Sequence, residues 1–220
     1  MKRFAFTMLE LVFVIIVIGI LAVLAMPNFN RHPLQEAAEQ VAGHIRYTQH
    51  LAMMDDRFDP NNQFWYREMW MLYIRQVHDI NNGHENEWFY EVFSDRSDDG
   101  NSAGTEEAID PLTGETLGNG GDNTIDNTCA DDKIINLTRK YGIKNVVFSG
   151  GTNAIPSNQR RVVFDNVGRP YRNTSLNSPA AENWRDYLIT TDMNITLTGS
   201  DDSTAIITIR AETGYVSVTY

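Results

Sequence analysis

The sequence has little cysteine and little positive charge. Of its 220 residues only Cys129 is a cysteine, and 18 lysines and arginines stand against 29 aspartates and glutamates, which gives a formal net charge of −11. A single cysteine excludes an internal disulfide; in an oxidising compartment it is either buried and inert or free to pair between chains, and we favour the buried thiol. The negative charge disfavours nonspecific binding to nucleic acid or anionic lipid, so we expect no nucleic-acid partner.

The sequence also lacks the motifs of common enzyme chemistries. It contains no Gly-x-Ser-x-Gly turn, no His-Glu-x-x-His motif and no phosphate-binding loop, and no histidine stands at a usable spacing from the cysteine. His78 and His84 are candidates for a metal pair, but two loop histidines without a third ligand more often form polar surface. We therefore predict a protein that is not an enzyme and that uses no cofactor.

Only one long hydrophobic run is present, residues 6–26, and it holds a single ionisable residue, Glu10. A helix of this length, at about 1.5 Å per residue, is expected to cross a bilayer. Lys2 and Arg3 precede the run, and the positive-inside rule then places the N-terminus in the cytoplasm and the remaining chain outside. A carboxylate in an apolar span is costly unless it is paired, so Glu10 is expected to have a cationic partner.

These residues resemble the N-terminus of a type IV pilin or a type II secretion pseudopilin: Lys-Arg-Phe-Ala, then Phe-Thr-Met-Leu-Glu, then a long apolar helix. The resemblance implies that a prepilin peptidase cuts between Ala5 and Phe6 and methylates the new terminus at Phe6. Glu10 would then pair with the N-terminal ammonium of a neighbouring subunit, which offsets the desolvation of both charges. The family usually has glycine where this chain has Ala5. Pro27 matches a proline of related pilins and is expected to kink the helix.

A secretory signal peptide is the competing interpretation of the run, with a charged start, an apolar core and a cleavage site within 22–26. We favour the pilin-like interpretation, because Glu10 would be unusual in a signal and because helical periodicity continues beyond the run. Pro33 is expected in the first turn of a restarted helix that ends near residues 55–57. The polar face of this helix, which includes Gln40 and Gln49, is expected to be solvated. Its apolar stripe consists of Leu34, Ala38, Val41, Ile45, Thr48 and Ala52.

Beyond residue 59 the sequence predicts short strands separated by turns. Two aromatic segments, 69–74 and 88–93, flank the turn residues 81–83 and predict a hairpin. The C-terminal end alternates apolar and polar residues and predicts an antiparallel meander. The strands expected after residue 134 are 146–148, 161–164, 193–198, 205–209 and 215–218.

The segment 95–133 differs in composition from the rest of the chain. It is rich in carboxylates, glycine and asparagine and poor in large apolar side chains. Such composition predicts a solvated acidic loop rather than a core element. Calcium binding is the alternative, without the spacing of an EF-hand. The candidate ligands are Asp122, Asp126, Asp131 and Asp132.

Two blocks in the C-terminal half resemble the minor pseudopilin family GspH/FimT. The first block is Phe164-Asp165 with Gly168-Arg169-Pro170, and the second is Ile207-Thr208-Ile209 with Thr213-Gly214-Tyr215. The resemblance implies a structural subunit of a type II secretion system, assembled by its N-terminal helix into or at the tip of a short periplasmic pseudopilus.

The runner-up is a minor type IV pilin, FimT-like, that acts in pilus assembly or DNA uptake. Some FimT-like pilins bind DNA through a basic patch around a Gly-Arg turn, and Tyr171 is available here to stack on a base. We prefer the interpretation that these arginines balance nearby acids, because the chain is acidic. The candidate DNA contacts are Arg160, Arg161, Arg169 and Arg172, with Arg169 and Arg172 as the central pair.

We therefore predict an α+β protein in which a long N-terminal membrane-spanning α-helix packs on an antiparallel β-sheet domain, as in the pilin-like fold. The protein is predicted to cross the bacterial inner membrane once, with a cytoplasmic N-terminus and a periplasmic C-terminal domain. After processing it is predicted to be part of the assembled pseudopilus. The predicted partners are other pseudopilins or pilins, the prepilin peptidase, the inner-membrane assembly platform and the membrane itself. The predicted parts are a leader peptide at 1–5, a transmembrane helix at 6–26, the periplasmic half of the long helix at 27–58 and a periplasmic β-rich globular domain at 59–220.

Overall fold

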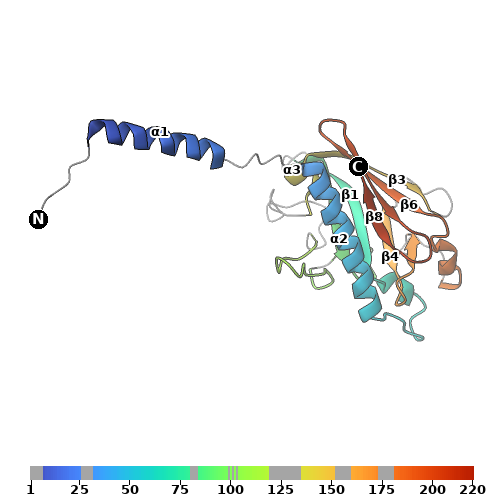
Figure 1. Ribbon diagram of the computed structural model, residues 1–220. Coiled ribbons are helices and arrows are strands. Elements are labelled where there is room, and N and C mark those ends of the chain that lie inside the picture. The colour runs from blue at the N-terminus through green and yellow to red at the C-terminus, as the bar shows by residue number, and fades with distance from the viewer. Residues whose placement is uncertain are drawn as a thin grey trace, which may run out of the picture. The chain divides into compact units, whose positions relative to one another are not determined.

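The computed structural model describes residues 7–25, 32–79, 84–98, 100, 102, 104–118, 135–151, 160–172 and 181–220. The chain divides into two compact units, Met1–His32 and Pro33–Tyr220. The first unit contains helix α1 (Met8–Ala25), and the second contains all the remaining helices and strands (Figure 1).

Helix α1 begins where Thr7 caps it. The Thr7 hydroxyl accepts a hydrogen bond from the backbone N–H of Glu10 at 3.3 Å, and the Thr-x-x-Glu spacing is that of a capping box. The helix is apolar on every side, so it has no polar face to turn toward water. Its described side chains are exposed, from Met8 and Leu9 at 83% to Val17 at 37%.

The prediction that residues 6–26 cross the bacterial inner membrane once, with a cytoplasmic N-terminus and a periplasmic C-terminal domain, is wrong. Within the part of the chain that the structure describes, no helix is both long enough and apolar enough to span a bilayer. The 18 residues of α1 extend about 27 Å, short of a hydrocarbon core of about 30 Å.

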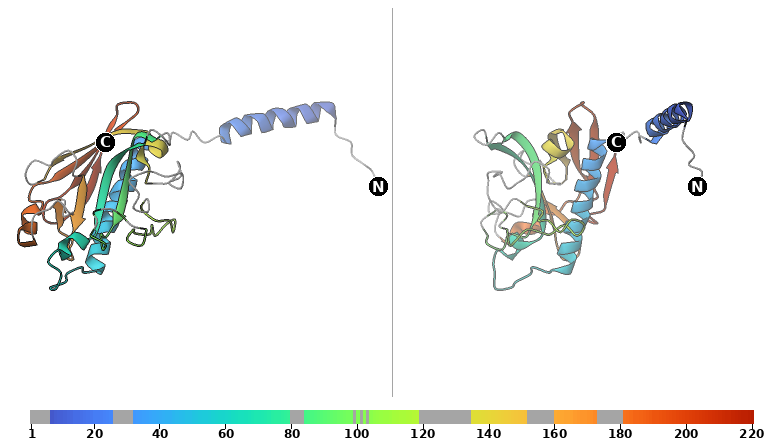
Figure 2. Two further views of the ribbon diagram at one scale, coloured as in Figure 1. Left: turned by 180° about the vertical axis from the view of Figure 1, so that it is seen from behind. Right: turned by 90° about the vertical axis from the view of Figure 1, so that its left-hand side faces the viewer.

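Helix α2 (Pro33–Met54) is the longest helix of the second unit and packs on its strands. Pro33 occupies its first position, as predicted, because a missing N–H costs nothing there. Its buried face contacts strands of both sheets (Figure 2). The small residues on this face let the strands approach closely. The predicted stripe is confirmed from Ala38 onward, and the buried residues are Ala37, Ala38, Val41, Ala42, His44, Ile45, Thr48 and Ala52.

Two antiparallel sheets pack against this helix. The first has the strand order β2-β1-β4-β5 and the second β3-β6-β7-β8. The predicted aromatic hairpin and C-terminal meander are both confirmed. The strands of the first sheet are β1 (Met71–Asp79), β2 (His84–Phe93), β4 (Arg161–Phe164) and β5 (Pro170–Arg172). Those of the second are β3 (Ile143–Gly150), β6 (Met193–Gly199), β7 (Thr204–Ile209) and β8 (Val216–Thr219).

Three short helices complete the described elements. The 3-10 helix η1 (Trp65–Glu68) precedes β1, and helix α3 (Leu137–Tyr141) precedes β3. A second 3-10 helix, η2 (Ala181–Tyr187), lies between β5 and β6. Contacts join η1 to η2, so two segments more than a hundred residues apart in sequence lie side by side.

The predicted fold class is therefore wrong in two respects. The structure is a mixed α/β arrangement with two antiparallel sheets, where a single β-sheet domain was expected. The long membrane-spanning helix is replaced by two helices, α1 and α2, in separate units. The reason for the two sheets is a long-range strand pairing. Strand β1 pairs with β4, so the β1–β2 hairpin forms a sheet with β4 and β5 and not with the C-terminal meander.

The acidic segment also differs from its predicted character. Residues 104–118 are not a solvated excursion, because Ala108 and Leu117 belong to the main core. Backbone hydrogen bonds join Ala108 N–H to Val92 O at 2.8 Å and Val92 N–H to Leu117 O at 2.7 Å. The segment thus covers the outer edge of β2 and satisfies its backbone groups.

Candidate functional site

Glu10 lies in the first turn of α1 rather than deep within the apolar run. The unpaired N–H groups of a helix N-terminus favour a carboxylate there, so helix capping alone gives Glu10 one structural role. The Thr7-x-x-Glu10 spacing is visible in the sequence, so this capping role could have been predicted from it. Glu10 is also the one acid in a helix whose apolar side chains are exposed.

Several predicted residues lie outside the described part of the chain. These include the predicted cleavage pair Ala5 and Phe6, the predicted kink residue Pro27, and Cys129. The four calcium candidates Asp122, Asp126, Asp131 and Asp132 also lie outside it. The side chains of His78 and His84 are likewise not described. Among the residues that are described, no group of three or more His, Cys, Asp or Glu is placed to hold a metal ion.

Two of the four DNA-candidate arginines are buried. Arg161 and Arg172 are each 8% exposed. Arg161 donates a hydrogen bond to Gly100 O at 2.7 Å and lies over the Tyr73 ring at 4.2 Å. Arg172 lies 6.0 Å from the centre of the Tyr187 ring. Burial lowers the pKa of both guanidinium groups. These two side chains therefore lie in the interior of the unit and not on an exposed surface that DNA could contact.

The other two arginines are more exposed but are engaged separately. Arg160 lies over the Trp88 ring at 4.5 Å. Arg169 forms an ion pair with Asp165, with 2.7 Å between Nε and Oδ2. The structure thus brings no two of these four arginines into a shared exposed patch within the described residues.

Asp165 organises the turn between β4 and β5. Its side chain is buried and accepts hydrogen bonds from the backbone N–H groups of Val167 and Arg169, at 3.1 and 2.8 Å. It also accepts from the Arg169 guanidinium and from the Tyr171 hydroxyl, at 2.7 and 3.1 Å. Burial raises the pKa of Tyr171, and the Asp165 charge raises it further. The phenol therefore stays protonated and available as a donor.

Gln49 on α2 joins the two sequence blocks that resemble GspH/FimT. Its side-chain amide donates to Gly168 O at 2.7 Å and to Thr213 O at 2.9 Å. Gly214 has φ +67°, and a Cβ added there would meet Gly168 O at 2.8 Å. The two turns therefore lie in direct contact and are held to the same helix. Sequence analysis assigned Gln49 to a solvated face, because periodicity does not show which polar side chains meet a distant turn.

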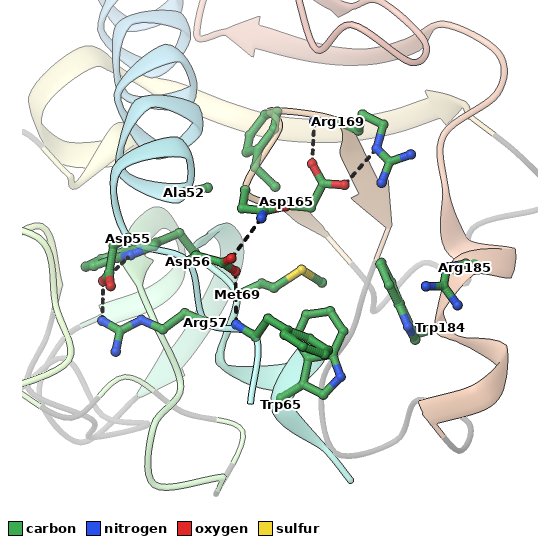
Figure 3. Close-up of a pocket in the computed structure, with 14 residues that line it drawn as sticks. Ala52, Asp55, Asp56, Arg57, Trp65, Met69, Asp165, Arg169, Trp184 and Arg185 are labelled. Carbon is green, nitrogen blue, oxygen red and sulfur yellow. Dashed lines mark hydrogen bonds and ion pairs between the residues drawn. The ribbon is translucent and has the colours of Figure 1, made fainter. Parts of the chain in front are cut away.

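A pocket of about 220 Å³ lies beside this junction, at the C-terminal end of α2 (Figure 3). It is bordered by residues that follow α2, by η1, by the β4–β5 turn and by η2. Sequence analysis did not identify this pocket. Its wall includes Asp56, Trp65, Met69, Asn166, Arg169 and Trp184.

The polar groups of this wall are held by neighbouring residues. Asp56 accepts from Asn166 Nδ2 at 2.9 Å and from the Phe58 N–H at 3.0 Å. Asp55 forms an ion pair with Arg57. Because these carboxylates are fixed by other groups, their remaining lone pairs are pre-oriented.

The aromatic part of the wall comes from η1 and η2. The rings of Trp65 and Trp184 pack edge to face, with centroids 5.2 Å apart. Trp184 also contacts Tyr171 at 4.9 Å, and the Arg185 guanidinium lies 5.0 Å from its centre. These contacts fix the orientation of the indole rings beside the pocket (Figure 3).

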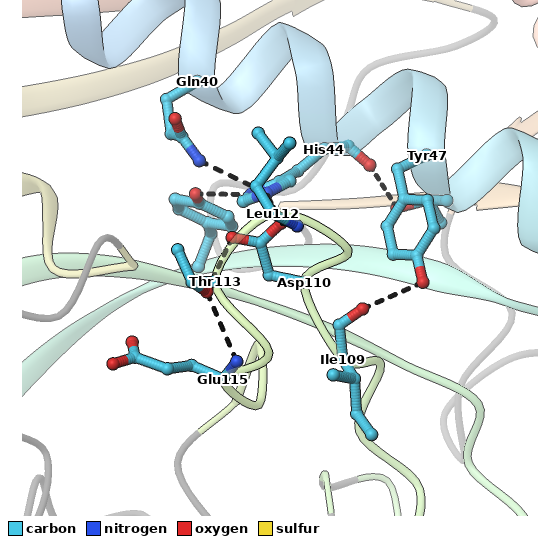
Figure 4. A network of polar contacts seen from close by, with 10 residues as sticks. Gln40, His44, Tyr47, Ile109, Asp110, Leu112, Thr113 and Glu115 are labelled. Carbon is cyan, nitrogen blue, oxygen red and sulfur yellow. Dashed lines mark hydrogen bonds and ion pairs between the residues drawn. The ribbon is translucent and has the colours of Figure 1, made fainter.

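A buried polar network lies on another part of α2 (Figure 4). His44 is 5% exposed, and its Nδ1 lies 2.7 Å from the Tyr90 hydroxyl. Gln40 Nε2 lies 3.2 Å from His44 Nε2. If the Gln40 amide donates to Nε2, the imidazole proton resides on Nδ1 and is donated to Tyr90, which describes a neutral histidine. Burial lowers the pKa of His44, which agrees with this neutral form.

Asp110 brings the segment 104–118 to this network. Its carboxylate lies 3.8 Å from His44 Nε2 and accepts a hydrogen bond from the Leu112 N–H at 3.0 Å. Burial raises the pKa of Asp110, but the hydrogen bonds from Leu112 and Thr113 outweigh burial, and the net pKa is lowered. Tyr47 adds a bond to Ile109 O at 2.9 Å. The network therefore holds the acidic segment to α2.

Comparisons of this chain with models of protein families, with curated proteins and with solved structures find no match in any of the three. Two features of the described residues point to a function: helix α1 with its single carboxylate, Glu10, and the pocket at the C-terminal end of α2.

Proposed function

We propose that this chain is a minor pseudopilin of a type II secretion system. In this role α1 is the assembly element, and the second unit is the part that the filament presents. The observation that carries the proposal is an apolar helix with exposed side chains on every side and a single carboxylate in its first turn. Such a helix is stable in water only when another apolar surface covers it.

The covering surface in this proposal is formed by the corresponding helices of other pseudopilins. Cleavage between Ala5 and Phe6 by a prepilin peptidase creates an N-terminal ammonium, and an assembly platform adds the processed subunit to the filament. Glu10 then meets the ammonium of a neighbour among apolar side chains. Removing one partner of a desolvated ion pair costs about 3–5 kcal/mol, so the pair selects subunits that have been cleaved.

The substitution Glu10→Gln separates this role from helix capping. Glutamine at the third helical position retains the capping box but carries no charge. We expect Glu10→Gln to reduce incorporation into filaments by tenfold or more, measured as the fraction of the chain recovered with sheared filaments. Glu10→Val should have at least as large an effect.

Glu36→Gln is the matched control, because Glu36 is an exposed acid in the first turn of α2. It should incorporate as the unchanged chain does. Normal incorporation of Glu10→Gln would show that Glu10 only caps its helix, and the pairing role would then be rejected.

The alternative of a DNA-binding minor pilin has less support. Of its central pair of arginines, Arg169 forms an ion pair with Asp165, and Arg172 is only 8% exposed. A DNA groove needs exposed cations that follow the phosphate backbone. No described observation favours this second function.

A further inference from the structure

We infer that the pocket at the C-terminal end of α2 binds a neutral saccharide. This inference is independent of filament assembly, because every residue that lines the pocket belongs to the unit Pro33–Tyr220. The charge of the wall, its hydrogen-bonding groups, its aromatic rings and its size each restrict the class of ligand.

The charges of the wall balance. It carries three carboxylates and three guanidinium groups, so their formal sum is zero. Two of the carboxylates, Asp55 and Asp165, are already in ion pairs with wall arginines. An ionic ligand would have to compete with these pairs, whereas a neutral ligand leaves them intact. The six residues are Asp55, Asp56, Asp165, Arg57, Arg169 and Arg185.

The hydrogen-bonding groups suit hydroxyl ligands. Asp56 is exposed and accepts from Asn166 at 2.9 Å, which places an acceptor beside a donor at the wall. The Asp165 carboxylate is buried and already used, and its role is to hold Arg169 at 2.7 Å as a further donor. A hydroxyl group both donates and accepts, so adjacent hydroxyls of a sugar match such donor–acceptor pairs. The Arg169 side chain is 46% exposed, and its pair with Asp165 uses Nε, so the terminal nitrogens can donate to a ligand.

Aromatic rings also border the pocket, where Trp65 is half-buried and Trp184 is 5% exposed. In Figure 3, Trp65 and Trp184 border the side of the pocket that faces away from Asp55. Indole rings present an electron-rich face to C–H groups, and the C–H face of a sugar ring is the apolar side of an otherwise polar molecule. A ligand with one apolar face and many hydroxyls therefore matches a wall that carries both indole rings and polar groups.

The size of the pocket favours a short ligand. Its volume of about 220 Å³ lies below the roughly 300–1,000 Å³ of sites for drug-sized molecules. It accommodates one sugar ring of a chain, with further rings in solvent. A peptide also offers neutral polar groups, but its apolar side chains do not match a wall with six charged groups.

The test is titration of the full-length chain with maltotriose, cellotriose and chitotriose, followed by tryptophan fluorescence and by calorimetry. A detergent without a sugar head group keeps the apolar α1 in solution and does not compete. We expect saturable binding of at least one trisaccharide. Binding should weaken at least tenfold in Trp65→Ala and in Asn166→Ala.

Two controls keep the result interpretable. Tyr220→Ala removes an exposed aromatic ring that does not line the pocket and should bind normally. Trp184→Phe keeps a ring at a position that is 5% exposed and should weaken binding less than Trp65→Ala. Circular dichroism should show all variants folded.

Absence of binding to all three trisaccharides by the folded protein would overturn the inference. Binding that both pocket variants leave unchanged would also overturn it, since the sugar would then bind elsewhere. Saturable binding of a neutral tripeptide at the same variants, without sugar binding, would assign the pocket to peptides instead. Each of these results leaves the assembly role of α1 unaffected, and a failure of the Glu10 experiment leaves the pocket unaffected.

Discussion

Helices α1 and α2 have similar lengths, 18 and 22 residues, but opposite relations to solvent. Helix α2 divides its residues between a buried stripe and a polar face, and two sheets of the same unit cover the stripe. Helix α1 has no polar face, and its described apolar side chains are exposed. The apolar side chains of α2 are thus covered by contacts within its own unit, whereas those of α1 require a partner from outside its unit.

The largest expected effect is the loss of a core contact of α2. Ile45 is fully buried, so Ile45→Ala should lower the free energy of unfolding by about 2–5 kcal/mol through lost burial and a cavity. Ile16→Ala on α1, where the side chain is 54% exposed, should change it by less than about 0.5 kcal/mol. Denaturant unfolding followed by tryptophan fluorescence measures both. Equal effects would remove the distinction between the two helices.

A smaller effect is expected at the junction held by Gln49. Gly214→Ala introduces a Cβ at φ +67°, 2.8 Å from Gly168 O, and should cost about 1–3 kcal/mol. Gly43→Ala should instead stabilise the protein. Nothing lies within 4 Å of its added Cβ, and alanine is more favourable than glycine in a helix interior by about 0.5–1 kcal/mol. The two glycine variants should therefore shift the thermal midpoint in opposite directions. A shift in the same direction would contradict the close contact of the two turns with α2.

The smallest expected effect comes from His44. Because burial lowers its pKa in the folded protein, the unfolded chain binds the proton more tightly. The stability that neutral His44 contributes is full above about pH 6.5, the ordinary value, and falls as the pH drops toward 5. Asp110, whose pKa is also lowered, loses its contribution only below its ordinary value of 3.8.

The measurement is the free energy of unfolding at pH 7 and pH 5. Because His44 takes up at most one proton, it can change the free energy of unfolding by at most about 1.4 kcal/mol per pH unit. His44→Gln should flatten this dependence, while His50→Gln, at an exposed position of the same helix, should leave it unchanged. A dependence that persists in His44→Gln would assign it to other groups.

Local patterns predicted the elements of the second unit well. Pro33 marked the start of α2, and the alternation of residues 193–197 predicted β6. These features depend on neighbours a few residues apart, which sequence periodicity reports directly. The end of α2 at Met54 also lies close to the predicted end at residues 55–57.

Long-range features could not be predicted in this way. The pairing of β1 with β4 joins Met71 to Val163, and no local pattern selects that partner over the C-terminal strands. Composition described 95–133 as a solvated loop, yet Leu117 is in the core. Gln49 and His44 act through contacts with residues far away in sequence. The membrane-spanning prediction is contradicted because no helix among the described residues is both long enough and apolar enough to span a bilayer.

The central claim is that the working protein keeps α1 and that its chain starts at Phe6, with a new amine that Glu10 of a neighbour can bind. Mass spectrometry of the N-terminal peptide of the native protein tests it most directly. The account predicts a chain that starts at Phe6 with one added methyl group. An intact Met1, or a start near residue 27 that removes α1, would contradict it.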